Sequence, residues 1–272
     1  MLIRFGHEFT VTCTQPTPML CLTAAHVERS GDLLAPEKLT NSRDDVPVHS
    51  YYDIFGNVVR RFVAPVGEYT FGSDATLRDN GMIDEVPPPE AGDTPIAALP
   101  DEVLIYLVGS RYCETDLLSP VAWELFGRTA PGWERVQAIS EFVHSRIAFN
   151  YQDADATRTA FGAFEECKGV CRDFTHLGIA LCRAMNIPAR YVNGYLGDIG
   201  VPVAPYPMDF SAWMEVFVAG KWYTLDPRHH ARRIGRIVTA RGRDAADVPL
   251  IQSFGPHVLS KFEVWTDEVW EG

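Results

Sequence analysis

Short apolar or alternating runs characterise the first 80 residues of this chain. Runs such as MLIRF, EFTVTC and MLCLTAA are separated by glycine, proline and polar residues. YYDIFGNVVRRFVAP predicts two strands around a turn at residues 55–57, and GEYTFGSDATL predicts another strand. Several short strands at this spacing favour an antiparallel β-sandwich.

The spacing of apolar residues changes after the proline-rich stretch at residues 84–99, which is the best linker candidate. PDEVLIYLVGS and SPVAWELFG predict short helices, and PGWERVQAISEFVHSRIAFN has the i, i+3, i+4 spacing of an amphipathic helix. Beyond Pro188, ARYVNGYLG, SAWMEVFV and KWYTLD predict strands, RIGRIVTARG a possible fourth and SKFEVWTDEVW a terminal one. We therefore expect a β-rich domain over residues 1–95 and an α+β domain over residues 96–272.

Composition narrows the class of protein. The chain has 272 residues, 46% of them hydrophobic, which is enough to bury a sizeable core. A formal net charge of −12 disfavours a nucleic-acid binder, and no apolar run reaches the roughly 18 residues of a membrane helix. We see no signal peptide, and six scattered cysteines suggest reduced thiols, so we expect a cytoplasmic location.

The segment GVCRDFTHLGIALCRAMNIPARYVNGY places Cys171 at the start of an apolar helix. Unpaired N–H groups and the helix dipole favour a thiolate there, and a thiolate is a nucleophile. Asp173 is expected to cap or stabilise the same helix start. The alternative is a small buried apolar residue, as most cytosolic cysteines are. A zinc or redox site with Cys167 is weaker, because no second cysteine pair follows at the usual spacing.

A second group of polar side chains lies downstream in SAWMEVFVAGKWYTLDPRHH. If residues 219–220 form a two-residue turn, Val218 faces Lys221, and positions 211, 213, 226 and 228 share one face of the sheet. Positions 211 and 226 then become diagonal neighbours, roughly 7–8 Å apart at the backbone. Glu215 lies two positions after Trp213, so a regular strand places it on the same face. We expect it to be a hydrogen-bonded or solvated neighbour of this group. The charged stretch RGRDAADV at residues 241–248 predicts an exposed loop.

These two segments resemble the transglutaminase-like superfamily, whose members carry a papain-like cysteine, histidine and aspartate triad. The first is similar to the helix that bears the nucleophile, and the second to the family's paired strands. The N-terminal half resembles the β-rich domain that precedes this core in many bacterial members. The resemblance implies an α+β fold, with a papain-like core whose cysteine helix packs on an antiparallel sheet, preceded by a β-sandwich-like domain.

Carried over position by position, the nucleophile falls on Cys171, the orienting carboxylate on Asp226 and the histidine on Ser211. A serine hydroxyl cannot act as a general base near neutral pH, so another group has to accept the thiol proton. The candidate substitutes are His229, His230 and His176, each with a structural role as its alternative. Trp213 and Arg228 are candidate cleft-lining residues, and large aromatic side chains more often support a core.

The resemblance implies cysteine-dependent acyl transfer on an amide, through a thioester on Cys171. Water would open the thioester in a peptidase or amidase, and an amine would open it in a transglutaminase; we favour the hydrolytic version. The expected partner is a peptide or protein substrate, without a cofactor or a metal. The alternative, favoured by Ser211, is a catalytically impaired relative that binds a peptide or protein. The sequence does not indicate an oligomeric state.

Overall fold

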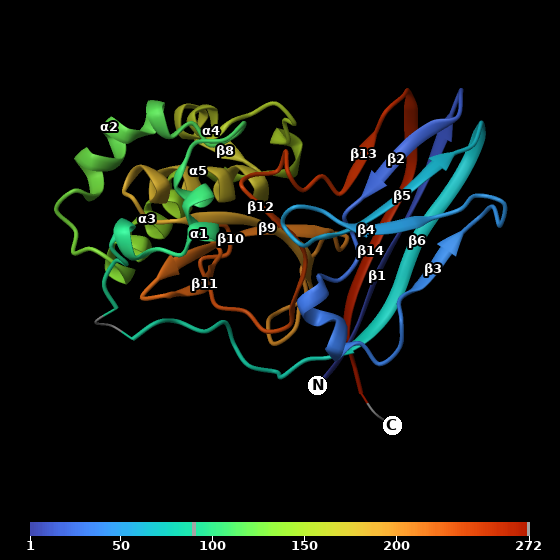
Figure 1. Ribbon diagram of the computed structural model, residues 1–272, viewed down its shortest axis with the longest axis horizontal. Coiled ribbons are helices and arrows are strands. Elements are labelled where there is room, and N and C mark those ends of the chain that lie inside the picture. Colours follow the sequence, from blue (N-terminus) through green and yellow to red (C-terminus); the bar gives the residue numbers. More distant parts are fainter. Residues whose placement is uncertain (89–90, 271–272) are drawn as a thin grey trace.

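The chain folds into a β-sandwich and a second part in which helices cover one antiparallel sheet (Figure 1). The computed structural model describes residues 1–88 and 91–270. Most strands and helices occur in separate stretches of the chain rather than in regular alternation. The α+β class predicted from the sequence is therefore confirmed.

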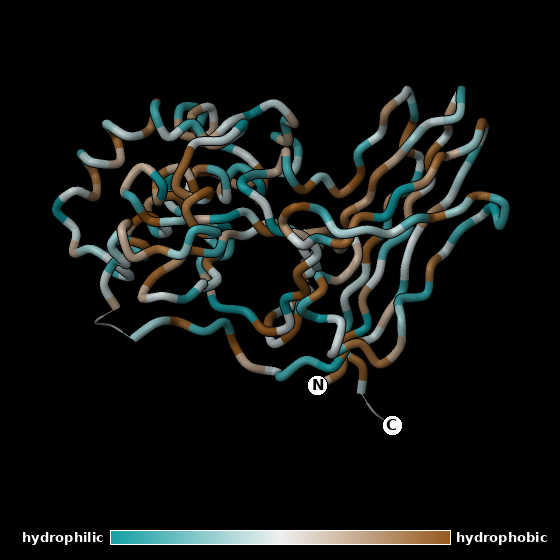
Figure 2. Tube along the Cα trace, viewed as in Figure 1, coloured by the Kyte–Doolittle hydropathy of each residue, from teal (hydrophilic) through white to brown (hydrophobic). Residues whose placement is uncertain are grey.

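Two four-stranded antiparallel sheets form the sandwich, with the orders β14-β1-β6-β3 and β13-β2-β5-β4. Hydrophobic and hydrophilic residues alternate along these strands (Figure 2). The inward-facing residues, among them Phe9, Phe62 and Phe71, pack into one apolar cluster. The strands are β1 Leu2–Cys13, β2 Thr17–Cys21, β3 Lys38–Asn41, β4 His49–Tyr52, β5 Val58–Ala64, β6 Gly67–Arg78, β13 Ile251–Ser253 and β14 His257–Val269.

One long strand, β1, replaces the two short strands expected from MLIRF and EFTVTC. The glycine between those runs suggested a break. Its role is close packing instead, because a Cβ on Gly6 would lie 2.4 Å from the ring of Trp265 on β14. A glycine in a strand can thus mark a close approach rather than the end of the strand.

The end of the chain returns to the sandwich. β14 pairs with β1 from Leu2↔Val269 to Cys13↔His257, so the start of β1 and the end of β14 lie at the same end of the sheet (Figure 1). The expected terminal strand is present, but it does not belong to the sheet of the helical part. The predicted division into residues 1–95 and 96–272 therefore does not follow the sheets. Alternation along a strand predicts the strand but carries no information about its partner.

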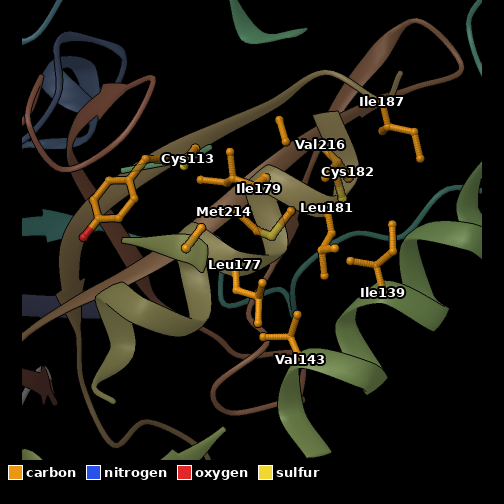
Figure 3. Packing of buried hydrophobic residues seen from close by; sticks show 14 of the residues in the cluster. Cys113, Ile139, Val143, Leu177, Ile179, Leu181, Cys182, Ile187, Met214 and Val216 are labelled. Atoms are coloured by element: carbon orange, nitrogen blue, oxygen red, sulfur yellow. The ribbon is translucent and has the colours of Figure 1, made fainter. Parts of the chain in front are cut away.

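Helix α5 is the centre of the second part, and the sheet β11-β10-β9-β12 lies against it. Its apolar side chains pack between those of α3 and β10 (Figure 3). None of the helices in the described residues is both long and apolar enough to cross a membrane. The elements are α1 Asp101–Leu104, α2 Thr115–Phe126, α3 Trp133–Arg146, β7 Ala148–Phe149, α4 Ala160–Glu166, β8 Lys168–Gly169, α5 Cys171–Ala184, β9 Ala189–Leu196, β10 Phe210–Val218, β11 Lys221–Leu225 and β12 Arg236–Gly242.

A shared apolar cluster joins the sandwich to this sheet. Phe5 of β1 packs with Tyr195 of β9, Phe210 of β10 and Ile237 of β12. The buried ring of His7 adds a polar contact, with 2.9 Å between its Nδ1 and the Tyr195 hydroxyl oxygen. The sandwich is therefore fixed directly against the strands β9 and β10.

Candidate active site

Cys171 is the first residue of α5, as the sequence predicted. The chain reaches it through β8, which pairs in parallel with β7. The backbone N–H of Val170 donates to Asp173 Oδ2 at 2.8 Å, so Asp173 caps the helix start as expected. A Cβ on Gly169 would lie 2.5 Å from the Asp173 carboxylate, and glycine is therefore needed for this close approach.

Cys171 as a residue is partly exposed, while residues 173–183 of α5 behind it are buried. Burial raises the pKa of the Cys171 thiol, although Arg228 and the backbone N–H of Ala212 act in the opposite direction. The carboxylates of Asp209 and Asp226 also raise it, because they disfavour a second negative charge. Burial thus outweighs the preference for a thiolate that we expected from the helix start.

β10 and β11 form the predicted hairpin. Val218 pairs with Lys221, so Ala219 and Gly220 are the two-residue turn. Both turn residues have positive φ angles, 49° and 81°, as a type I′ turn requires. The predicted register is therefore confirmed from Val218↔Lys221 to Met214↔Leu225, where the pairing ends, so Asp226 and Arg228 lie beyond β11.

Ser211 is buried in β10, and its Oγ has no hydrogen-bond partner in the described part of the chain. Its cross-strand neighbour is Gly194, where a Cβ would come within 2.4 Å of the Trp213 ring. Trp213 itself is fully buried, with the Arg236 guanidinium 4.8 Å from its ring centroid. Contrary to expectation, Trp213 does not line the cleft that holds Cys171, because Arg236 and β9 cover the indole.

The buried carboxylate of Asp226 lies between an imidazole and a guanidinium. Its Oδ2 is 2.8 Å from His229 Nδ1 and accepts a hydrogen bond from Arg236 at 3.0 Å. Burial alone would raise the pKa of Asp226, but Arg236 and His229 hold it well below its usual range. An ionised carboxylate only accepts hydrogen bonds, so Nδ1 of His229 carries the proton and Nε2 is free to accept one.

Arg236 is held in turn by Asp84, which lies in the segment between the sandwich and the helical part. Its Nε is 3.0 Å from Asp84 Oδ2, and the backbone N–H of Arg233 donates to the same oxygen at 2.9 Å. One buried guanidinium therefore bridges two carboxylates. The sequence analysis missed this contact, because no local pattern links residues 152 positions apart.

The three candidate bases have different surroundings. His230 points toward Glu141, with 2.8 Å between its Nε2 and the carboxylate. His176 is fully buried, its Nε2 accepts a backbone N–H, and burial holds its pKa well below the usual value. Of the three, only His229 is paired with Asp226.

Cys171 and Ser211 line the same cleft, which has a volume of about 650 Å³. A smaller polar cavity of about 50 Å³ is lined by Arg228 and His229. Ser211 also lines this second cavity, so it borders both the cleft of the thiol and the cavity of the imidazole. Asp226 lines neither of these two spaces and borders a separate cavity of about 500 Å³. The structure therefore places positions 171 and 211 on one cleft, and Asp226 beside His229, which lines the cavity that Ser211 also borders.

Two charged residues of the hairpin region differ in their role. Arg228 lies with its guanidinium carbon 3.9 Å from the Phe149 ring centroid and lines the small polar cavity, not the larger cleft. Glu215 is buried and hydrogen-bonded to Arg190 at 2.6 Å and to Arg241 at 3.0 Å, as the strand parity suggested. Only Arg228 is thus placed near the reacting groups.

Cys167 ends α4 in a left-handed conformation, and its thiol lies 3.6 Å from the carbonyl oxygen of Phe164. Over residues 1–88 and 91–270, no group of three or more His, Cys, Asp and Glu side chains is arranged to hold a metal ion. The zinc alternative therefore has no ligand cluster in that part of the chain.

Residues 241–248 are not the exposed loop that their composition suggested. Asp244 and Val248 are buried, and the backbone N–H of Ala245 donates to His176. Arg243 pairs with Asp247 at 2.8 Å, so the charges of this segment partly satisfy each other. A polar composition does not predict exposure when the charges have partners within the same segment.

Comparison with known proteins places this geometry in context. Residues 121–227 match the model of the transglutaminase-like superfamily. A crystal structure from Cytophaga hutchinsonii, described as a "putative cysteine protease", is similar with a TM-score of 0.86 and 26% identity, covering 100% of this chain and 92% of that chain. An uncharacterized protein of Mycobacterium leprae is 24% identical over 205 residues, 74% of this chain and 73% of that protein. One of Mycobacterium tuberculosis is 38% identical over 91 residues, 30% of this chain and 29% of that protein.

Proposed function

Residues 121–227 give this chain the core of the transglutaminase-like superfamily, and from this premise we propose that it is a cysteine-dependent acyl-transfer enzyme. The nucleophile is Cys171, the substrate is an amide of a peptide or protein, and water opens the thioester. One observation carries the proposal: His229, oriented by Asp226, adjoins the cleft of the thiol through Ser211. The imidazole missing from position 211 is thus supplied from a position 18 residues further along the chain.

Proton transfer begins at the thiol. Cys171 gives its proton to the Ser211 hydroxyl while this hydroxyl gives its own proton to Nε2 of His229. The sulfur attacks the carbonyl carbon as its proton leaves, and the imidazolium returns the proton along the same route to the leaving amine as the C–N bond breaks. Water then gives a proton to Nε2 of His229 as its oxygen adds to the thioester carbonyl. The C–S bond breaks, the sulfur takes that proton back from the imidazolium, and the acid product leaves with the thiol restored. Asp226 remains ionised and stabilises the imidazolium throughout.

Ser211 explains how a site with a raised thiol pKa could still react. A preformed thiolate is scarce when burial raises the pKa of Cys171, so the proton has to leave as the sulfur attacks. The buried and unpartnered Ser211 Oγ supports this role as a relay. The backbone N–H of Cys171 lies at the helix start, where N–H groups lack partners within the helix, and it is our candidate oxyanion donor.

The second candidate function is a binding module that retains the cleft without the chemistry. The raised pKa of the Cys171 thiol and the absence of an imidazole at position 211 favour it. The maintained contacts of Asp226 with His229 and Arg236 favour the enzyme. The pH dependence of the thiol reaction distinguishes these two functions.

The test is the rate of Cys171 alkylation by iodoacetamide between pH 5 and 10, followed by mass spectrometry of the peptide that contains residue 171. We expect the wild-type profile to show, besides the transition of the thiol itself, a second limb that depends on an imidazole. His229→Gln should remove that limb, and His230→Gln, the matched control, should keep it. A single transition at or above the free-thiol value of about 8.5, unchanged by His229→Gln, would favour the binding module.

The products separate the enzymatic possibilities. Incubation with a mixture of peptides should yield new amino termini from a peptidase, ammonia from an amidase, and cross-linked peptides with ammonia from a transglutaminase. Cys171→Ala is the control and should abolish each product. The hydrolytic outcome, the peptide or protein substrate and the cytoplasmic location remain predictions from the sequence.

A further inference from the structure

One wall of the Cys171 cleft comes from the sandwich rather than from the helical part. Ile251 of β13 and Leu259 and Phe262 of β14 line this cleft. All three side chains are apolar, and Leu259 keeps 48% of its surface exposed. A bound apolar group would cover this half-exposed leucine and remove its apolar surface from water, which is favourable.

A β-bulge turns Leu259 and Phe262 to the same side of β14. The pairing of β14 with β1 shifts between Thr10 and Val11, which leaves Ser260 as an extra residue. Residues three positions apart face opposite sides of a regular strand, and one extra residue between them restores a common side. Bulges of this kind re-aim side chains and are frequent beside active sites.

This wall is continuous with the strand that carries Ser211. The ring of Phe262 lies with its centroid 6.0 Å from that of Phe210, the residue before Ser211. Phe210 packs in turn on Tyr195, with 4.5 Å between the ring centroids. The distance between the apolar wall and the reacting groups is therefore set by packed aromatic rings.

We infer that this wall is an apolar subsite for the acyl part of the substrate, an inference that rests on the proposed function. The residue whose carbonyl Cys171 attacks carries a large apolar side chain, such as leucine or phenylalanine, and this side chain lies against Leu259. A cleft of about 650 Å³ has room for such a group. The leaving amine lies toward the polar cavity of His229, from which it receives its proton.

Binding of two small amides tests the subsite without any chemistry. The probes are N-acetyl-phenylalanine methylamide and N-acetyl-glycine methylamide, titrated by NMR into the full chain carrying Cys171→Ala. We expect about tenfold tighter binding of the phenylalanine probe. Adding Leu259→Asp should abolish this preference. Val258→Asp is the matched control, because Val258 is the adjacent residue, is 66% exposed and does not line the cleft.

Equal affinity for the two probes, no binding of either, or an equal loss in both aspartate variants would overturn the subsite. Leu259→Ala serves as a second variant if Leu259→Asp lowers the melting temperature. The result is independent of the proposed reaction, because the binding protein lacks the thiol. A failed alkylation test with a retained preference for phenylalanine would remove the enzyme and leave the apolar subsite.

Discussion

The Cys171 thiol and the Asp226 carboxylate are both acids enclosed by protein, yet their environments act on them in opposite directions. Burial disfavours the charged form of each. It raises the pKa of the thiol, because the cation nearby, Arg228, is opposed by two carboxylates. For Asp226, Arg236 and His229 more than compensate, and the pKa falls. Burial therefore decides the direction of the pKa shift at the thiol, whereas at the carboxylate the partners outweigh burial.

The site therefore has two halves: a carboxylate half, formed by Asp226 with His229 and Arg236, and a thiol half, formed by Cys171. The carboxylate half is ionised and hydrogen-bonded before any substrate arrives. The thiol half becomes reactive only when a base accepts its proton, and Ser211 is the residue that separates the two. A substitution among the partners of one half should change the properties of that half and leave the other half unchanged.

The largest expected effect follows from removing the cation on the carboxylate side. Arg236→Ala leaves the buried Asp226 and the half-buried Asp84 without their shared guanidinium, and breaking a buried pair in this way costs about 3–5 kcal/mol. The free energy of unfolding in urea at pH 7 measures the loss. Arg232→Ala is the control, because Arg232 is exposed and contacts only the backbone carbonyl of Asp84 among the described groups.

The pH dependence of that loss has a definite sign. The pKa of Asp226 is lowered in the folded protein, so its charge stabilises the fold above the unfolded value of about 3.9. This contribution disappears as the pH falls through the lower folded value. The stability difference between wild type and Arg236→Ala should therefore be largest near neutral pH and shrink below about pH 4. A constant difference would mean that Arg236 acts through packing alone.

The next effect concerns the support of the thiol side. Gly169→Ala places a methyl group 2.5 Å from the Asp173 carboxylate, which forces the helix cap to move. We expect a loss of about 1–3 kcal/mol in unfolding free energy, together with an altered alkylation rate at Cys171. Gly92→Ala should change neither, because no atom of residues 1–88 or 91–270 lies within 4 Å of a Cβ at that position, apart from its own neighbours. Equal behaviour of the two variants would separate the thiol from its helix cap.

Ser211→His should place a base directly beside the Cys171 thiol, so that the thiol no longer depends on a distant base to lose its proton. An imidazolium beside the thiol favours the thiolate, so the alkylation rate of Cys171 at pH 7 should rise about tenfold. The same iodoacetamide assay measures this. Ser211→Asn brings similar bulk without a titratable ring and removes the hydroxyl that relays the proton, so its rate should not exceed that of wild type. An equal increase with asparagine would attribute the effect to repacking and not to charge.

Contacts between residues that are close in the sequence could be predicted, and contacts between distant residues could not. The register of the β10–β11 hairpin could be predicted, because a two-residue turn fixes the pairing of its neighbours. The place of Cys171 followed from a turn and the apolar helix after it. The contact of Asp84 with Arg236 could not be predicted, because it joins residues 152 positions apart. The same reason hid β14, whose partner is the first strand of the chain.

The alternation of side chains along a strand also predicted which residues lie on the same face of the sheet, but not what covers that face. Ser211 and Trp213 have the same parity, yet one borders the cleft and the other lies under Arg236. His229 was one of three equal candidates, because the sequence could not fix the backbone after Pro227. Its pairing with Asp226 depends on a turn in which the His229 N–H donates to Asp226 Oδ1 at 3.1 Å.

The smallest expected effect concerns Asp84, in the segment that connects the sandwich to the helical part. It tests whether this residue contributes to the carboxylate half. Asp84→Asn removes one of the two charges on Arg236 but keeps an acceptor for the Arg233 N–H. Asp226 also retains both of its partners, so we expect a loss of only about 1 kcal/mol and an alkylation rate within about twofold of wild type. Glu85→Gln, the matched control, should change neither, because its contact with Lys221 is exposed. A loss as large as that of Arg236→Ala would make Asp84 an equal member of the carboxylate half, since the guanidinium would then depend on both anions for its place.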